Sequence, residues 1–257
     1  MIYHLNAACG CILGNGRMRN EDNFFFDGKH LPIQNRGLKQ ALQMSSDSSK
    51  PQIFAVFDGM GGEKDGHEAA CCASEAVFEE SAVLNRLAIS GREFFEAACA
   101  RANSRILEMA KERRITTMGT TIAALWFCAS EIVSCNVGDS KIFRIRNGQM
   151  YQISQDHTDE RILAAMGIKK KPVLLQFLGM NDAELCVEPY ISKGEIQDGD
   201  IYLICTDGVT DSVDADSIFK VVQSADCASQ IVKEILKRVE EGYGSDNATV
   251  AAICVSL

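Results

Sequence analysis

Short apolar runs bounded by turn residues recur along the chain and predict β-strands. The clearest run, Ile53–Phe57, has five apolar residues in a row, which is typical of a strand buried on both faces. The runs that we expect to form strands are Ile2–Ala8, Asn23–Phe26, Ile53–Phe57, Gly119–Phe127, Ile132–Val137, Ile142–Ile145, Ile201–Cys205 and Ala248–Val255.

Apolar residues at steps of three and four predict helices, and these helices come in pairs. One pair lies between the third and fourth strands, and the other precedes the last strand. The predicted helices are Gly66–Arg86, Arg92–Arg113, Ala215–Val222 and Cys227–Glu240. Grouped strands with paired helices indicate sheets covered by helical layers, an α+β architecture, rather than a regular βαβ alternation.

The segment Gly28–Lys50 is polar and rich in turn residues, so we expect a long surface loop there, with a short helical piece around Leu38–Met44. The four prolines are dispersed, and no linker or internal repeat interrupts the chain. We therefore expect residues 1–257 to form a single domain.

The composition narrows the class of partner. The chain has 26 basic and 35 acidic residues, a net charge of −9, which disfavours nucleic acids and anionic membranes but suits cations. The longest apolar run, around Ile122–Ala129, is too short to span a membrane.

The eleven cysteines are scattered without a Cys-x-x-Cys pair, and the N-terminus does not resemble a signal peptide. A reducing, cytoplasmic location is expected.

Acidic residues recur where the predicted strands begin or end. Asp58-Gly59 and Asp207-Gly208 each follow an apolar strand, directly or after one threonine, and Asp139 follows another. Glu21-Asp22 and Asp246 precede strands. Such acids can converge at one edge of a sheet core, where oxygen ligands suit Mg²⁺ or Mn²⁺. Asp-Gly is also a common turn dipeptide, so from the pattern alone a metal site and ordinary turns both remain open.

An ordered set of motifs resembles the metal-dependent serine/threonine protein phosphatases of type 2C, the PPM family, and most closely its stand-alone bacterial members. The resemblance runs from about Tyr3 to Val255. Its motifs are Arg17-x-x-Asn-Glu-Asp22, Asp58-Gly-Met-Gly-Gly62, Met118-Gly-Thr-Thr121, Val137-Gly-Asp-Ser140, Asp156-His-Thr158, Thr206-Asp-Gly208 and Ser245-Asp-Asn247. The resemblance implies a four-layer αββα sandwich of two antiparallel sheets flanked by paired helices.

The resemblance also implies a metal centre with two Mn²⁺ or Mg²⁺ ions. Asp58 matches the acid that bridges both ions, and Glu21 and the Gly59 carbonyl match ligands of one of them. Asp207 and Asp246 match ligands of the other ion. In bacterial relatives a third, weaker ion is held at the position of Asp139, with Asp207 shared.

The same resemblance assigns the chemistry. Arg17 matches the arginine that binds the substrate phosphate, and Asp22 matches a carboxylate that orients metal-bound water. A hydroxide bridging the two ions would attack the phosphorus of phosphoserine or phosphothreonine in line. The implied partners are phosphoproteins and a bacterial Ser/Thr kinase that the enzyme opposes, and the protein is expected to be a monomer.

Two positions depart from the family pattern. Met60 stands where some members carry a histidine that can protonate the leaving oxygen, and Lys141 stands where arginine is more common. The proton would then come from water on a third ion at Asp139 or from His157. Residues 159–199 correspond to a flap beside the active site and include the basic run Lys169–Lys171, either a solvated face or a substrate-steering element.

Two other functions compete with the metal-dependent hydrolase. Cys11 and Arg17 satisfy the Cys-x5-Arg pattern of tyrosine phosphatases, but that loop enters a helix, whereas a strand is expected after Arg17. The alternative outside catalysis is a weakly active regulatory or binding protein of the same fold. The retained acids Glu21, Asp22, Asp58, Asp207 and Asp246 argue against it.

Overall fold

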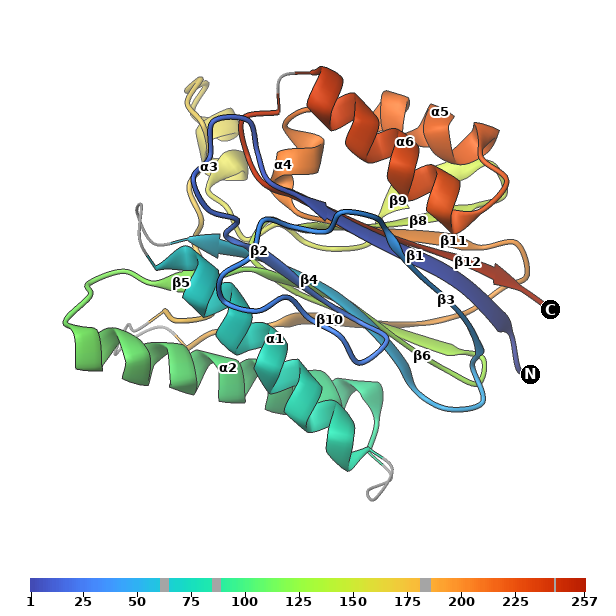
Figure 1. Ribbon diagram of the computed structural model, residues 1–257, viewed down its shortest axis with the longest axis horizontal. Helices are drawn as coiled ribbons and strands as arrows, with labels where there is room; N and C mark the ends of the chain where they lie inside the picture. Colours follow the sequence, from blue (N-terminus) through green and yellow to red (C-terminus); the bar gives the residue numbers. More distant parts are fainter. Residues whose placement is uncertain (61–64, 85–88, 181–185, 243) are drawn as a thin grey trace.

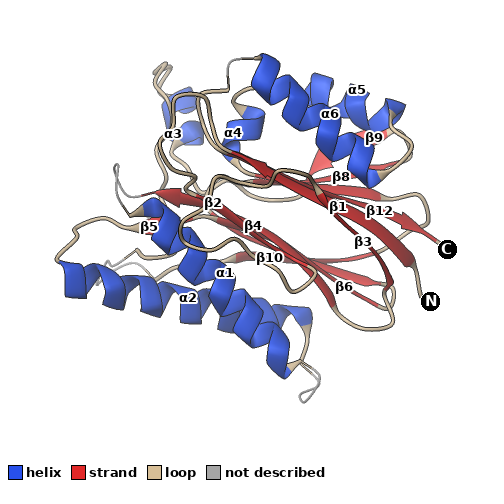
Figure 2. Cartoon of the chain, viewed as in Figure 1, coloured by secondary structure: helices blue, strands red, loops and turns tan. Residues whose placement is uncertain are grey.

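Two antiparallel β-sheets lie face to face, and helices cover the outer face of each sheet (Figure 1). A computed structural model of the protein describes residues 1–60, 65–84, 89–180, 186–242 and 244–257. In Figure 2 the red strands form the two central layers and the blue helices the outer ones. The expected four-layer αββα sandwich of the α+β class is confirmed.

The first sheet carries both chain termini on neighbouring central strands, β1 and β12, which pair along their whole length. Its strands run in the order β3 (Leu42–Asp47), β1 (His4–Ile12), β12 (Ala248–Ser256), β11 (Ile201–Cys205), β8 (Lys141–Arg146) and β9 (Gln149–Gln152). Because β11 and β12 are antiparallel, the end of β11 lies beside the start of β12.

The second sheet is built around the apolar strand identified first in the sequence. Its strands run in the order β10 (Tyr190–Glu195), β7 (Glu131–Val137), β6 (Ile122–Cys128), β4 (Gln52–Met60) and β2 (Asp22–Phe26). The short strand β5 (Gly119–Thr120) pairs with the end of β4.

The apolar strands are buried on both faces because each faces two cores. In β4, Phe54 and Val56 point between the sheets, whereas Ala55 and Phe57 pack against the helices. A chain of rings crosses from one sheet to the other: Phe54 lies 5.8 Å from Phe127, and Phe127 lies 5.3 Å from Tyr202, between ring centroids. Burial of these large rings holds the two sheets together.

The helices form the outer layers in pairs. Those on the second sheet are α1 (Gly66–Val83) and α2 (Gly91–Arg113), and those on the first are α5 (Ala215–Ser224) and α6 (Ala228–Glu241). Ser90 and Glu93 form a reciprocal capping box that begins α2. Two short helices, α3 (Glu160–Ala165) and α4 (Asp207–Thr210), lie beside the ends of the strands. No helix of the described residues is long and apolar enough to cross a membrane.

Three expectations about the elements need correction or limits. The helical piece expected around Leu38–Met44 is wrong: part of this segment belongs to β3, whose residues alternate between partly buried and exposed. Strands β9 and β10 were not expected. Helix α1 ends at Val83 rather than Arg86, and residues 85–88 lie outside the described residues.

Candidate metal centre

The candidate ligands come from strand ends of both sheets. Asp22 begins β2 and stands opposite Asp58 of β4 in the strand register. Asp207 follows β11 after a single residue, and Asp246 lies two residues before β12. Because β11 and β12 are neighbours, Asp207 and Asp246 emerge at the same edge of the first sheet. Contacts of β12 with β2 and β4 bring this edge next to Asp22 and Asp58.

Asp22 connects the two sheets by hydrogen bonds. Its Oδ2 accepts hydrogen bonds from the hydroxyl groups of Thr206 (2.8 Å) and Thr249 (2.6 Å), which belong to the first sheet and its edge. The residue is 2% exposed. Burial raises the pKa of Asp22 to about 7; the two hydroxyl groups oppose the shift, and the charges of Asp207 and Asp246 add to it.

Asp58 and Asp207 approach each other closely enough for their carboxyl groups to share a hydrogen bond. Burial raises the pKa of Asp58 well above its ordinary value, and the charges of Asp22 and Asp207 add to the shift. Burial also raises the pKa of Asp207, which the hydrogen bond to Asp58 partly offsets. These carboxyl groups therefore repel one another when ionised, and a divalent cation between them would remove that cost.

The donor set fits a hard cation. The candidate side chains offer oxygen donors only, as Mg²⁺ and Mn²⁺ prefer. Among the described residues, no three His, Cys, Asp or Glu side chains already form a complete ligand set.

Glu21 and Gly59 lie together where β4 approaches α1. The Gly59 N–H donates to the Glu21 carbonyl oxygen over 3.1 Å. A Cβ atom at Gly59 would lie only 2.1 Å from the Gly66 carbonyl oxygen, so a side chain at this position is excluded. Burial raises the pKa of Glu21, with the charge of Arg17 acting in the opposite direction.

Arg17 bridges two of the candidate ligands rather than standing apart from them. Its Nη2 lies 2.7 Å from Asp246 Oδ2, and its Nη1 lies 3.6 Å from Glu21 Oε2. Its Nε also donates to the Ser245 carbonyl oxygen over 3.2 Å. The Arg17 side chain is 41% exposed to solvent.

Asp139 lies in the turn after β7, on the Asp207 side of the centre. Burial raises the pKa of Asp139 to about 6; the charge of Asp207 adds to the shift and the Lys141 ammonium opposes it. Lys141 is engaged in an ion pair with Asp156. Its charge is therefore held beside Asp139 by a contact that does not require the planar group of arginine.

His157 supports a turn. Its backbone N–H donates to the Gly138 carbonyl oxygen (3.0 Å), and its Nδ1 accepts from the Gly138 N–H (3.3 Å). Met60 is the last residue of β4, and its thioether carries no proton to give. Gly61 and Gly62, which complete the motif that begins at Asp58, lie outside the described residues.

Several hydroxyl groups that hold the acids had no role assigned from the sequence. The Asp58 N–H donates to Thr121 Oγ1 (3.0 Å), and Thr120 Oγ1 donates to the Asp58 carbonyl oxygen (2.9 Å). The Ser140 hydroxyl lies 2.6 Å from that of Thr121. Thr121 and Ser140 belong to two of the family motifs, and their place in those motifs could have indicated a role for them in the sequence. Thr249 stands inside an apolar run, where a buried hydroxyl needs a partner.

The structure does not support a thiolate nucleophile at Cys11. This cysteine is buried in β1, and Asn20 Nδ2 donates to its Sγ over 3.0 Å. Burial raises the pKa of the Cys11 thiol to about 12, and the charge of Asp22 adds to the shift. After Arg17 the chain enters strand β2, as expected, and not a helix.

In the basic run of the flap-like segment, Lys171 forms an exposed ion pair with Asp211, 3.1 Å between Nζ and Oδ2. Asp211 follows helix α4, which begins at Asp207. This contact places the basic run Lys169–Lys171 beside the candidate metal centre. Residues 181–185 of the segment lie outside the described residues.

With this geometry, the comparison with known proteins identifies the family. Residues 37–250 match the family model described as protein phosphatase 2C, and the chain belongs to this family. The matched residues include Asp58, Asp139, Asp207 and Asp246. They begin after Arg17, Glu21 and Asp22, so the placement of those three in the centre rests on the contacts described above.

The relatives are named serine/threonine protein phosphatases. The chain is 28% identical over 234 residues to PstP of Mycobacterium tuberculosis, an alignment that covers 86% of this chain and 44% of PstP. The chain thus spans less than half the length of that relative. It is 28% identical over 221 residues to the phosphatase stp of Listeria innocua, with 80% and 86% covered.

The fold also matches a crystal structure of the PstP catalytic domain in complex with two manganese ions. The TM-score is 0.75 at 26% identity, and the match covers 100% of both chains. The relatives therefore share this fold, and that structure contains the type of ion that the donor chemistry of the present centre favours.

Proposed function

We propose that this chain is a metal-dependent protein phosphatase that hydrolyses phosphoserine and phosphothreonine in proteins. The observation that carries the proposal is the convergence of the buried Asp22 with the partly buried Asp58 and Asp207 from the two sheets, whose carboxylates repel one another when ionised. Membership of the protein phosphatase 2C family supports the same activity.

The described residues suggest how two Mn²⁺ or Mg²⁺ ions would be held. Asp58 would contact both ions, Glu21 and the Gly59 carbonyl would hold one, and Asp207 and Asp246 the other. When bound, the ions lower the pKa of coordinated water and neutralise the phosphoryl oxygens. A third, weaker site would lie at Asp139.

The other residues bind and orient. The Arg17 guanidinium, now paired with Asp246 and Glu21, would turn toward a phosphate once a cation takes over the charge of those carboxylates. Thr206 and Thr249 fix the Asp22 carboxylate so that its free oxygen can accept a hydrogen bond from water in the centre.

The biological setting belongs to the same proposal. The substrates would be proteins phosphorylated by a Ser/Thr kinase, and the chain would act as a monomeric, single-domain enzyme in the cytoplasm. All eleven cysteines lie among the described residues and are unpaired, which supports a reducing compartment.

Phosphate release from phosphothreonine, phosphoserine and phosphotyrosine peptides tests the proposal. We expect release from the first two to require Mn²⁺ or Mg²⁺ and to stop with excess chelator. Asp58→Asn should lower the rate at least about a hundredfold, because it removes the shared ligand. Asp27→Asn is the matched control, since Asp27 is an exposed acid at the end of β2, away from the centre.

Full activity in excess chelator would contradict the metal-dependent mechanism. Metal binding without turnover on any phosphopeptide would instead favour a regulatory protein of the same fold.

A further inference from the structure

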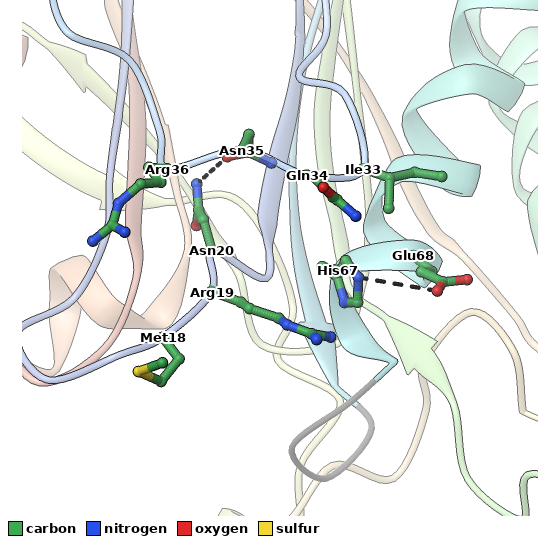
Figure 3. A pocket seen from close by; sticks show the side chains of 9 residues that line it. All are labelled: Met18, Arg19, Asn20, Ile33, Gln34, Asn35, Arg36, His67 and Glu68. Atoms are coloured by element: carbon green, nitrogen blue, oxygen red, sulfur yellow. Dashed lines mark hydrogen bonds and ion pairs between the residues drawn. The ribbon is translucent and has the colours of Figure 1, made fainter.

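A cavity of about 560 Å³ opens beside the candidate metal centre. Figure 3 shows that it lies between the segment 18–20, the segment 33–36 and the start of α1. The segment 18–20 joins Arg17 to Glu21, so one wall of the cavity is continuous with the centre.

The walls of the cavity are held in place by amide hydrogen bonds. The buried Asn20 donates from Nδ2 to Asn35 Oδ1 over 2.8 Å, the bond drawn at the top of Figure 3. Asn35 in turn donates to the Pro32 carbonyl oxygen (3.0 Å) and accepts from the Gly37 N–H (2.9 Å). The segment 33–36 is therefore fixed against the connection between β1 and β2.

His67 provides a polar group for a ligand. Its side chain lines the cavity and is only 7% exposed. Its Nδ1 is buried and has no hydrogen-bond partner among the described residues. In Figure 3 the ring lies between the Arg19 guanidinium and the Gln34 amide. A buried polar atom without a partner is costly, and a ligand in the cavity would remove that cost.

The charges around the cavity favour an anion. The exposed side chains of Arg19 and Arg36 both line it, and Arg36 forms no ion pair with a described residue. Glu68, the acid on the wall, is engaged by Arg113, and its Oε1 lies 4.0 Å from His67 Nε2 (Figure 3). His67 and Glu68 lie in the first turn of α1, where the helix dipole also favours negative charge.

We propose that this cavity binds a second anionic group of the substrate, a carboxylate or a phosphate carried two to four residues from the phosphorylated serine or threonine. The inference rests on the proposed function. Arg17 and Arg19 are two residues apart, and an extended peptide advances about 3.3 Å per residue, so two to four residues span about 7 to 13 Å. A peptide with its phosphate at Arg17 thus reaches the cavity with a nearby side chain.

Peptide substrates that differ in one side chain test this inference. A phosphothreonine peptide would carry glutamine, glutamate or a non-hydrolysable phosphonate analogue of phosphoserine at each position from two to four residues away, on either side. At saturating Mn²⁺ we expect kcat/KM for the best anionic peptide to exceed that of the glutamine peptide by about three- to tenfold. The glutamate and phosphonate arms distinguish an acidic from a doubly phosphorylated substrate.

Two variants locate the effect. Arg36→Gln and His67→Phe should each reduce the anionic preference by about threefold, whereas Lys39→Gln should leave it unchanged. Lys39 is an exposed cation three residues after Arg36 that does not line this cavity, so it is matched in charge and position. Because Arg36 is exposed, its replacement tests the cavity whether or not the buried ring of His67 tolerates substitution.

The outcomes separate the two proposals. Failure to hydrolyse even the glutamine peptide overturns the proposed function and this inference with it. Hydrolysis with equal kcat/KM for all three peptides leaves the proposed function standing and overturns the cavity's role. If Arg36→Gln leaves the anionic preference intact, the anion is recognised outside this cavity and the inference is overturned. The same follows if Lys39→Gln reduces the preference as much as Arg36→Gln does.

Discussion

Acidification from about pH 7.5 to about pH 5.5 should stabilise the metal-free protein, and Asp22→Asn should remove much of that effect. In the folded chain, burial holds the pKa of Asp22 at about 7. The unfolded chain releases the same proton near pH 4. The native state therefore binds more protons than the unfolded state between these values, and the free energy of unfolding falls as the pH rises.

The size of the effect follows from the two pKa values. For a pKa of about 7 in the folded and about 3.9 in the unfolded state, the free energy of unfolding changes by about 2 kcal/mol between pH 7.5 and 5.5. Asp139, with a pKa of about 6, adds about 1 kcal/mol. The raised pKa values of Asp58, Asp207 and Glu21 act in the same direction. Burial lowers the pKa of His67 and His157, and these residues act in the opposite direction.

Asp22→Asn isolates the first contribution. The asparagine carbonyl can still accept from Thr206 and Thr249, so the variant resembles the protonated residue. Its stability relative to the wild type should therefore decline by about 2 kcal/mol on acidification. Urea unfolding with chelator present, followed by the fluorescence of Trp126, measures this difference. Trp126 is the only tryptophan of the chain, lies in β6 and is 2% exposed.

Asp27→Asn is the control, because Asp27 is exposed and should show the pH dependence of the wild type. If Asp22→Asn and the wild type gain the same stability on acidification, Asp22 is not the group that holds the proton, and the account of its burial is wrong.

Three further predictions concern turnover. Cys11→Ser should keep kcat/KM within about threefold of the wild type, because the buried thiol takes no part in the chemistry; a folded but inactive variant would restore the thiolate hypothesis. Arg17→Ala should raise KM for phosphopeptides about tenfold, and an unchanged KM would show that Arg17 does not contact the phosphate. Asp139→Ala should slow phosphopeptide hydrolysis about tenfold more than nitrophenyl phosphate hydrolysis, because only the alkoxide needs protonation; His157→Ala should show no such selectivity, and equal losses with Asp139→Ala would assign it another role.

The strands that the sequence pattern predicts are those with a continuous apolar run, and the strands that it misses are edge strands. β3, β9 and β10 each lie at the edge of a sheet and are largely polar or exposed. No residue of these three strands is fully buried, so they need no apolar run, and their hydrogen-bonded partner strand defines them. β2 is also at an edge but carries Phe24–Phe26, and it was predicted.

The position of the candidate acids at strand ends could be predicted from the sequence, whereas their hydrogen-bond and ion-pair partners could not. The hydrogen bonds from Thr206 and Thr249 to Asp22 depend on how the two sheets stack, which local sequence does not specify. The ion pair of Arg17 with Asp246 joins residues more than 200 positions apart in the sequence, whereas its ion pair with Glu21 joins residues four positions apart. The spacing of residues along the sequence can therefore indicate only the pair of Arg17 with Glu21.

Isothermal titration of the chelator-treated protein with Mn²⁺ tests the central claim most directly. If carboxylates from the two sheets form one metal centre, the wild type and Asp27→Asn should each bind two ions per chain tightly, the number in the PstP catalytic-domain structure, with any third ion at Asp139 binding more weakly. Asp58→Asn should lose both, because both ions would share this ligand. Undiminished Mn²⁺ binding by a folded Asp58→Asn variant, or no binding by the wild type, would contradict the account.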